Sequence, residues 1–152
     1  FEEFPPDCFL NFVGYALFEA QFLNTYGVNK KKTINDPIFG FITLPSDLFY
    51  DIVSHRYFQR LRYIKQLGMT DFVYPAALHT RFQHALGASF LMGKALNTLR
   101  LKGIEISDEE YEASQLAVLL HDTGHGPLSH ALEYTLLNSV KHESISYLFM
   151  DK

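Results

Sequence analysis

The segment LLHDTGHGPLSH, residues 119–130, places three histidines and one aspartate within ten positions. An imidazole nitrogen and a carboxylate oxygen are suitable ligands for Zn, Mn, Fe or Co, and the lack of thiolates argues against a purely structural zinc site. Adjacent residues on a regular helix point about 100° apart, so His121 and Asp122 converge on one ion most easily where a helix ends. The glycines just beyond them provide that ending, and the pair predicts part of a metal site.

A third ligand is needed, and His84 is the best candidate. It stands in an apolar helical segment, where an imidazole without a partner is costly. Taken alone, His84 is better explained as a core histidine with a hydrogen-bond partner, and a lone His-Asp pair as a cap or surface pair. His125 follows His121 at helical i, i+4 spacing, but the neighbouring glycines interrupt a helix, so we place it in a loop beside the metal. The remaining candidates, His55 and His79, are interpreted as structural or surface residues.

Two groups of basic residues accompany the histidines. Arg81 lies one turn before His84, and residues at i and i+3 share a helix face. The fixed fork of arginine suits phosphate oxygens, and a metal with a guanidinium can neutralise a phosphoryl group under attack. The alternative for Arg81 is an ordinary surface salt bridge. The second group, in RYFQRLRYIKQ (56–66), predicts by itself an amphipathic helix with a solvated basic face.

The composition indicates one globular domain or a piece of one. The chain has 152 residues, of which 47% are hydrophobic and 15% aromatic. A net charge of −4 gives no long-range attraction to nucleic acid or anionic membranes, so neither is an expected partner. The single cysteine, Cys8, excludes an internal disulfide and fits a reducing compartment, which predicts a cytoplasmic location.

The most apolar run near the start, CFLNFVGYALFEAQFL (8–23), carries Asn11, Glu19 and Gln21 and lacks a basic leader. Those polar residues fall within the length needed to cross a bilayer. We interpret the run as a buried or partner-facing helix and as neither a signal nor a membrane anchor.

The elements that must position these side chains are mostly helices. Residues 30–37 have the composition of a linker or turn, and IFGFITL (38–44) that of a short strand or hairpin arm. Five helical segments follow. Three are longer: from Ser46 or Asp47 to about Gln66, from about Thr80 to Leu101, and from a capping box at Ser107 into His121. Two shorter ones are expected over 128–137 and from His142 onward. The 80–101 helix is apolar on nearly all sides and is predicted to be central. Its small residues Gly87, Ala88 and Gly93 would let neighbouring helices approach closely.

Four ordered blocks carry a family resemblance: FQRLRYIKQLG (58–68), HTRFQHALG (79–87), LLHDTGHGPLSH (119–130) and KHE (141–143). Together they resemble the HD-domain metal-dependent phosphohydrolases, and within them the deoxynucleoside triphosphate triphosphohydrolases, including the type that carries a SAM domain beside its HD domain. The resemblance implies a mostly α fold with an HD-domain helical core. Residues 34–152 would form the N-terminal part of a larger helical domain, and residues 1–33 an aromatic-rich segment and linker of unknown role.

The resemblance also implies roles for the clustered residues. The metal ligands would be His84, His121 and Asp122, holding a divalent cation that is Mn, Fe, Zn, Co or Mg. In catalysis, His125 would contact the phosphates or the attacking water, and His130 would protonate the departing 5′ oxygen. Glu133 stands where the family often has Asp, and His142 with Glu143 would complete the polar cluster.

Five further positions match substrate or regulatory contacts of the family. Arg81 matches a phosphate contact, and Gln66 and Leu67 match positions that line the deoxyribose. Arg60 and Arg62 match a segment linked to nucleotide regulation or assembly in some members. The resemblance therefore implies a nucleotide substrate, a homo-oligomer and, in some members, a nucleotide activator.

The implied reaction is hydrolysis of a deoxynucleoside triphosphate to deoxynucleoside and tripolyphosphate. Two alternatives stay open: an HD phosphohydrolase acting on another nucleotide or phosphate ester, and a noncatalytic nucleotide-binding or regulatory HD protein. One departure bears on this choice, because the family completes its metal site with a second aspartate far downstream of the HD pair. That position lies beyond Lys152, and Asp151 comes too early to match it. The site within these residues is therefore expected to be incomplete.

Overall fold

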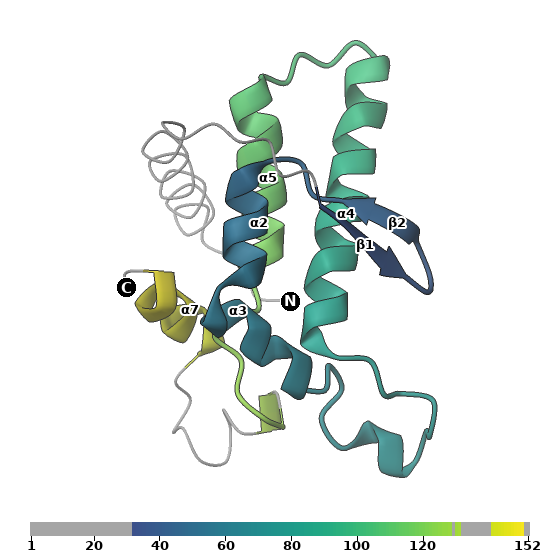
Figure 1. The fold of residues 1–152 in the computed structure, drawn as a ribbon, viewed down its shortest axis with the longest axis vertical. Coiled ribbons are helices and arrows are strands. Elements are labelled where there is room, and N and C mark those ends of the chain that lie inside the picture. Colours follow the sequence, from purple (N-terminus) through teal and green to yellow (C-terminus); the bar gives the residue numbers. More distant parts are fainter. Residues whose placement is uncertain (1–31, 129, 132–140, 151–152) are drawn as a thin grey trace.

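The computed structural model describes residues 32–128, 130–131 and 141–150. Two long helices joined by a short turn, α4 (Arg81–Leu101) and α5 (Asp108–Leu120), stand side by side at its centre (Figure 1). The other elements surround this pair: strands β1 (Thr33–Asp36) and β2 (Gly40–Thr43), helices α2 (Asp47–Ser54), α3 (Arg56–Gln59) and α7 (His142–Met150), and the 3-10 turns η1 (Arg60–Tyr63) and η2 (Thr70–Phe72). The fold is mostly α, as the sequence predicted.

A two-stranded antiparallel hairpin precedes the helices, with Ile34 opposite Ile42. The Asp36 carboxylate accepts hydrogen bonds from the backbone N–H groups of Ile38 and Phe39 at 2.8 and 2.9 Å, which closes the turn. The prediction of a hairpin arm at 38–44 is confirmed. The prediction of a linker or turn over 30–37 is wrong for residues 33–36, because cross-strand pairing with β2 makes this polar segment a strand.

The predicted helix from Ser46 to about Gln66 is interrupted at His55, which has extended backbone angles (φ −67°, ψ 141°). The imidazole of His55 accepts a hydrogen bond from the Tyr57 N–H at 3.4 Å and so caps the new start. The interruption has a packing reason. An unbroken helix that buried Phe49 and Val53 would turn Phe58 off that face, and the break brings Phe58 back into the core.

Capping boxes fix the starts of both central helices. In α4, the Thr80 hydroxyl accepts from the Gln83 N–H while the Gln83 side chain accepts from the Thr80 N–H. The same reciprocal arrangement joins Ser107 and Glu110 at the start of α5, as predicted. Because these boxes satisfy N–H groups that the helix leaves unpaired, they fix where α4 and α5 begin.

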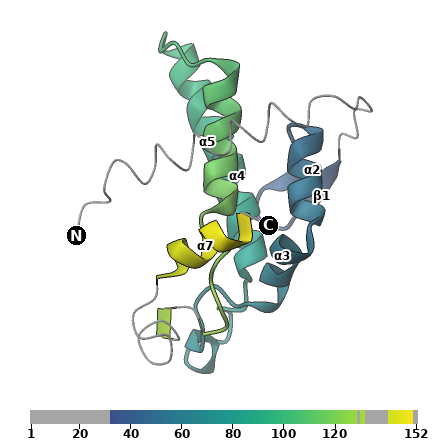
Figure 2. The same ribbon diagram turned by 90° about the vertical axis from the view of Figure 1, so that its left-hand side faces the viewer.

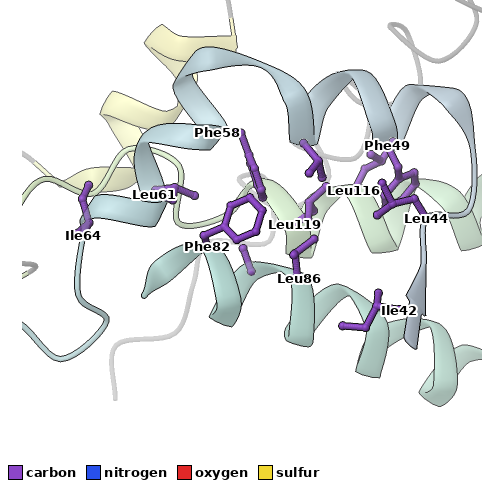
Figure 3. Packing of buried hydrophobic residues seen from close by; sticks show 12 residues of the cluster. Ile42, Leu44, Phe49, Phe58, Leu61, Ile64, Phe82, Leu86, Leu116 and Leu119 are labelled. Carbon is purple, nitrogen blue, oxygen red and sulfur yellow. The ribbon is translucent and has the colours of Figure 1, made fainter. Parts of the chain in front are cut away.

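The hydrophobic core lies between α2, α3 and η1 on one side and α4 and α5 on the other (Figure 3). Its largest fully buried apolar side chains are Phe49, Phe58, Leu61, Leu116 and Leu119. The prediction that α4 is apolar and central holds as far as Leu96, the last buried residue of the helix. Its last turn extends past the core, where Leu101 is 89% exposed.

The small residues of α4 allow close approaches of two kinds. A Cβ on Gly93 would collide with the Gln115 side-chain amide of α5, which confirms the predicted close contact between helices. A Cβ on Gly87 would lie 2.7 Å from the Phe39 ring, so this glycine makes room for the hairpin and not for a helix.

Two predicted segments lie outside the described residues: the aromatic run 8–23 and most of the helix expected over 128–137. Among the described helices, none combines the length and the apolar character needed to cross a membrane.

We predict that Gly93→Ala destabilises the protein. The buried side-chain amide of Gln115 occupies the position of the new methyl group, so this side chain must leave its present place against α4. Overpacking of this kind outweighs the helix propensity gained from alanine, with a net loss of about 1–2 kcal/mol. Urea unfolding followed by circular dichroism measures the loss.

Thr98→Ala, on the exposed side of the same helix, is the matched control and should change stability by less than about 0.5 kcal/mol. An unfolding midpoint for Gly93→Ala equal to or above that of the wild type would contradict the close α4–α5 contact.

Candidate functional site

The candidate site lies where α4 begins and α5 ends. Arg81 and His84 occupy the first turn of α4, which the Thr80 capping box fixes. His121 is the residue at which α5 ends, and Asp122 is the first residue of the turn that follows. Because the two helices run in opposite directions, these two ends adjoin each other (Figure 1).

The structure brings His84, His121 and Asp122 into one cluster. The Nε2 atom of His84 lies 3.7 Å from one carboxylate oxygen of Asp122, and Nε2 of His121 lies 3.3 Å from the other. One ligand atom from each of the three residues falls within 4.8 Å of the others. Two imidazole nitrogens and a carboxylate oxygen fit Mn, Fe, Co or Zn better than Mg, which prefers oxygen ligands.

The end of α5 also orients the His121 ring. Its Nδ1 lies 2.6 Å from the Val118 carbonyl oxygen, and a carbonyl can only accept, so Nδ1 carries the proton. The lone pair is then on Nε2, the nitrogen that faces Asp122. Backbone carbonyls orient metal-binding histidines in this way. The helix end therefore supplies both the position of His121 and the tautomer that a metal needs.

Arg81 is buried with Asp122. Its guanidinium is 2% exposed and donates to Asp122 Oδ2 at 2.5 Å and to the Gln66 carbonyl at 3.5 Å. The sequence offered two interpretations of Arg81, a phosphate contact and a surface salt bridge. The structure shows a salt bridge that is buried and that holds one of the candidate metal ligands.

Charges around Asp122 keep its carboxylate ionised. Burial acts to raise its pKa, but the charges of His121 and Arg81 outweigh burial and hold the pKa below its ordinary value. For His84 the balance is reversed, since burial lowers its pKa and the attraction of Asp122 offsets only part of that effect. An ionised carboxylate beside a neutral imidazole is the protonation state in which both can bind a cation.

A second cluster consists of His125, His130 and His142. The His125 ring is 1% exposed and stacks on His142 with ring centroids 3.7 Å apart, while His130 meets His125 edge-on at 4.7 Å. Burial, followed by the charge of Arg81, lowers the pKa of His125 to about 3, so this imidazole is neutral near pH 7. Its Nε2 lies 3.5 Å from Asp122 Oδ1, which places the two clusters in contact.

The structure places the remaining predicted site residues as follows. Gln66 is half-buried and adjoins Arg81 through its backbone carbonyl, and Leu67 next to it is 49% exposed. Gly68 then packs against Leu128, with the position of a Cβ 3.3 Å from the Leu128 carbonyl oxygen. The segment expected to line the deoxyribose therefore touches the chain just before His130. Glu133 lies outside the described residues, and so does the side chain of Glu143.

Arg60 has a structural role that the sequence did not predict. Its guanidinium donates to the backbone carbonyls of Thr123 and His125, at 2.5 and 2.8 Å, and so holds the loop between Asp122 and the second cluster. Arg62 points elsewhere, bonding Gln59 at 2.7 Å and covering the Phe82 ring at 3.6 Å. The expectation of a uniformly solvated basic face is therefore wrong for Arg60. An arginine that binds carbonyls more than sixty residues away leaves no local pattern in the sequence.

Gly124 and Ser146 form a second support that the sequence did not predict. The Gly124 N–H donates to the Ser146 hydroxyl at 2.8 Å, and a Cβ at Gly124 would collide with the His142 carbonyl. Helix α7 therefore crosses directly over the loop and brings His142 onto His125 (Figure 2). The sequence identified Gly124 only as a helix breaker.

Comparisons with known proteins agree with this geometry. A family profile described as the HD domain matches residues 81–152. The chain is 39% identical over 132 residues to the deoxynucleoside triphosphate triphosphohydrolase SAMHD1 homolog of Dictyostelium discoideum, covering 81% of this chain and 26% of that protein. It is 45% identical over 108 residues to the human deoxynucleoside triphosphate triphosphohydrolase SAMHD1, covering 70% of this chain and 17% of that protein.

Among solved structures, a phosphohydrolase from Bacteroides thetaiotaomicron superposes with a TM-score of 0.76 at 56% sequence identity, over 80% of this chain and 30% of that one. The chain thus spans between 17% and 30% of the length of these relatives. The residues matched to the HD profile include His84, His121 and Asp122, which the fold brings together. The chain therefore belongs to the HD-domain phosphohydrolases, the family that its four sequence blocks predicted.

Proposed function

We propose that the protein hydrolyses deoxynucleoside triphosphates to deoxynucleoside and tripolyphosphate. The observation that carries this proposal is the 3.5 Å contact between Asp122 and His125, which joins a cluster suited to a metal to a cluster suited to proton transfer. The names of the SAMHD1 relatives supply the substrate class. Residues 34–152 would form the N-terminal part of the HD domain.

In the proposed site, His84, His121 and Asp122 would hold a divalent transition metal. When bound, such a cation lowers the pKa of water and stabilises negative charge on a phosphoryl oxygen. Arg81 acts on the same carboxylate, because its buried guanidinium keeps Asp122 ionised and oriented. The contact of Arg81 with a phosphate is what the family resemblance implies, and a guanidinium suits that role.

The bond to be broken joins the α-phosphorus to the 5′ oxygen. Water attacks the α-phosphorus, the electron pair of the breaking bond goes to the 5′ oxygen, and His130 donates the proton that neutralises it. His130 is exposed to solvent and can be reprotonated after each turnover. Neutral His125 donates a hydrogen bond to a phosphate oxygen from its buried position, and His142 supports the His125 ring by stacking. Glu133 would orient His130.

The nearest alternative is an HD phosphohydrolase that acts on another nucleotide or phosphate ester, because the metal cluster alone does not determine which phosphate bond is hydrolysed. Gln66 adjoins Arg81 through its backbone carbonyl, and Gln66 and Leu67 would form the wall that recognises the deoxyribose. Product analysis separates the two reactions, because the proposed one releases tripolyphosphate and a monophosphatase releases orthophosphate. A noncatalytic nucleotide-binding protein would bind without releasing either.

A homo-oligomer, a nucleotide activator and a cytoplasmic location stay predictions from the sequence.

The cluster predicts that His84→Ala and Asp122→Asn each lose the ion held by His84, His121 and Asp122, with different effects on stability. His84 is 38% exposed, so its loss should leave the fold intact. Asp122→Asn removes the partner of a buried guanidinium and should cost about 3–5 kcal/mol. Metal content by plasma mass spectrometry and thermal unfolding measure the two effects, with His55→Ala as the control that should keep the wild-type metal content. A metal content in His84→Ala equal to that of the wild type would remove His84 from the ligand set.

The proton-donor role of His130 predicts a fall in kcat of at least about a hundredfold in His130→Ala, because general acid catalysis contributes at least that much. The exposed position of His130 makes a folding defect a minor concern, and unchanged metal content would verify that the first cluster is intact. The assay uses the full-length protein with its metal, and His55→Ala should retain wild-type turnover. A kcat within about threefold of the wild type would show that another group protonates the 5′ oxygen.

A further inference from the structure

The second cluster is itself built like a metal site. His125, His130 and His142 come from the loop after Asp122, from the chain just beyond it and from the first residue of α7. One ring nitrogen from each lies within 4.8 Å of the other two, and the ring centroids are 3.7–5.4 Å apart. Three imidazoles are a ligand set that suits Zn²⁺, and Zn²⁺ sites with three histidines and an open fourth position are well known.

We propose that His125, His130 and His142 form a second metal site, specific for Zn²⁺ over Mg²⁺, and that Zn²⁺ bound there inhibits the enzyme. This site shares no ligand with the cluster of His84, His121 and Asp122. Mg²⁺ is excluded by the ligands, because it prefers oxygen atoms and keeps several waters. The inhibition, but not the binding, rests on the proposed function.

Two contacts prepare this cluster for an ion. Arg60 holds the backbone carbonyl of His125 at 2.8 Å, and the bond from the Gly124 N–H to the Ser146 hydroxyl, at 2.8 Å, ties the loop to α7. His125 and His142 are therefore held to each other by their backbones and not only by ring stacking. Ligands supported in this way lose little freedom when an ion binds.

Binding requires one local movement. Zn–N bonds of about 2.0–2.1 Å in a tetrahedron place the ligand nitrogens about 3.4 Å apart. In the structure the three ring nitrogens are separated by up to 4.8 Å, so they must move closer together. The His125 and His142 rings are also nearly parallel, at 16°, so their lone pairs cannot both point at one ion. His125 is 1% exposed and fixed, whereas His142 is half-buried, so His142 is the ring that turns.

The expected consequence is loss of the proton donor. A nitrogen that coordinates Zn²⁺ has no lone pair left to carry a proton, so His130 cannot protonate the departing 5′ oxygen while the ion is bound. Zn²⁺ at this site would also occupy the space in which His125 meets the phosphates. The first cluster would keep its metal throughout.

Zinc stoichiometry tests the site without reference to activity. The metal-free chain is titrated with Zn²⁺ against a chromophoric chelator, and the wild type should bind two ions. His142→Ala and His84→Ala should each bind one, the double variant none, and the control His55→Ala two. His130→Ala alters an exposed side chain and should also bind one ion. It therefore tests the site even if His142→Ala disturbs α7. Bound ions that all survive both His142→Ala and His130→Ala, or a single wild-type ion that is lost in His84→Ala but kept in His142→Ala, would overturn the site.

The inhibition is tested in the full-length protein loaded with one equivalent of its activating metal. A second equivalent of Zn²⁺ should lower kcat at least tenfold, and a weak chelator should restore it while the first metal stays bound. Two bound ions with unchanged kcat would overturn the inhibition and leave the site. Absence of any hydrolysis would count against the proposed function, and the stoichiometry would still decide whether the second site exists.

Discussion

The buried ion pair between Arg81 and Asp122 joins the start of α4 to the end of α5, and both clusters depend on it. Burial alone would raise the pKa of this carboxylate. The guanidinium keeps it charged and fixes its two oxygens, one facing His84 and the other facing His121 and His125. The pair also explains why the site forms at this end of the helices. The capping box at Thr80 sets where α4 begins, and with it the position of Arg81.

The loop that follows Asp122 is held from two sides, and this support gives the site its second half. Arg60 reaches the loop carbonyls from η1, and Ser146 reaches the Gly124 N–H from α7. The basic segment and the last described helix are therefore both parts of the site, although neither supplies a ligand to the first cluster. Gly124 permits this because a larger residue would collide with the backbone of α7. The two clusters thus meet at Asp122 and are otherwise supported by different elements.

Features that depend on near neighbours in the chain could be predicted from the sequence. The capping box at Ser107, the helix ending at His121 and the hairpin arm after Ile38 are each specified within a few residues. The break at His55 could not be predicted, because it depends on where Phe58 must point in the core. The same holds for the distant carbonyl partners of Arg60. The residue types predicted that His84 joins His121 and Asp122 in one cluster. The geometry of that cluster could not be predicted, because it depends on how α4 packs on α5.

The central claim is that water attacks the α-phosphorus of a deoxynucleoside triphosphate at the centre formed by His84, His121 and Asp122. The most direct measurement is hydrolysis by the full-length, metal-loaded protein in water labelled with ¹⁸O, followed by mass spectrometry of the products. The account predicts one ¹⁸O in tripolyphosphate, none in the deoxynucleoside, and no product when His84 is replaced by alanine. Label in orthophosphate, or in the 5′ oxygen of the deoxynucleoside, would contradict it.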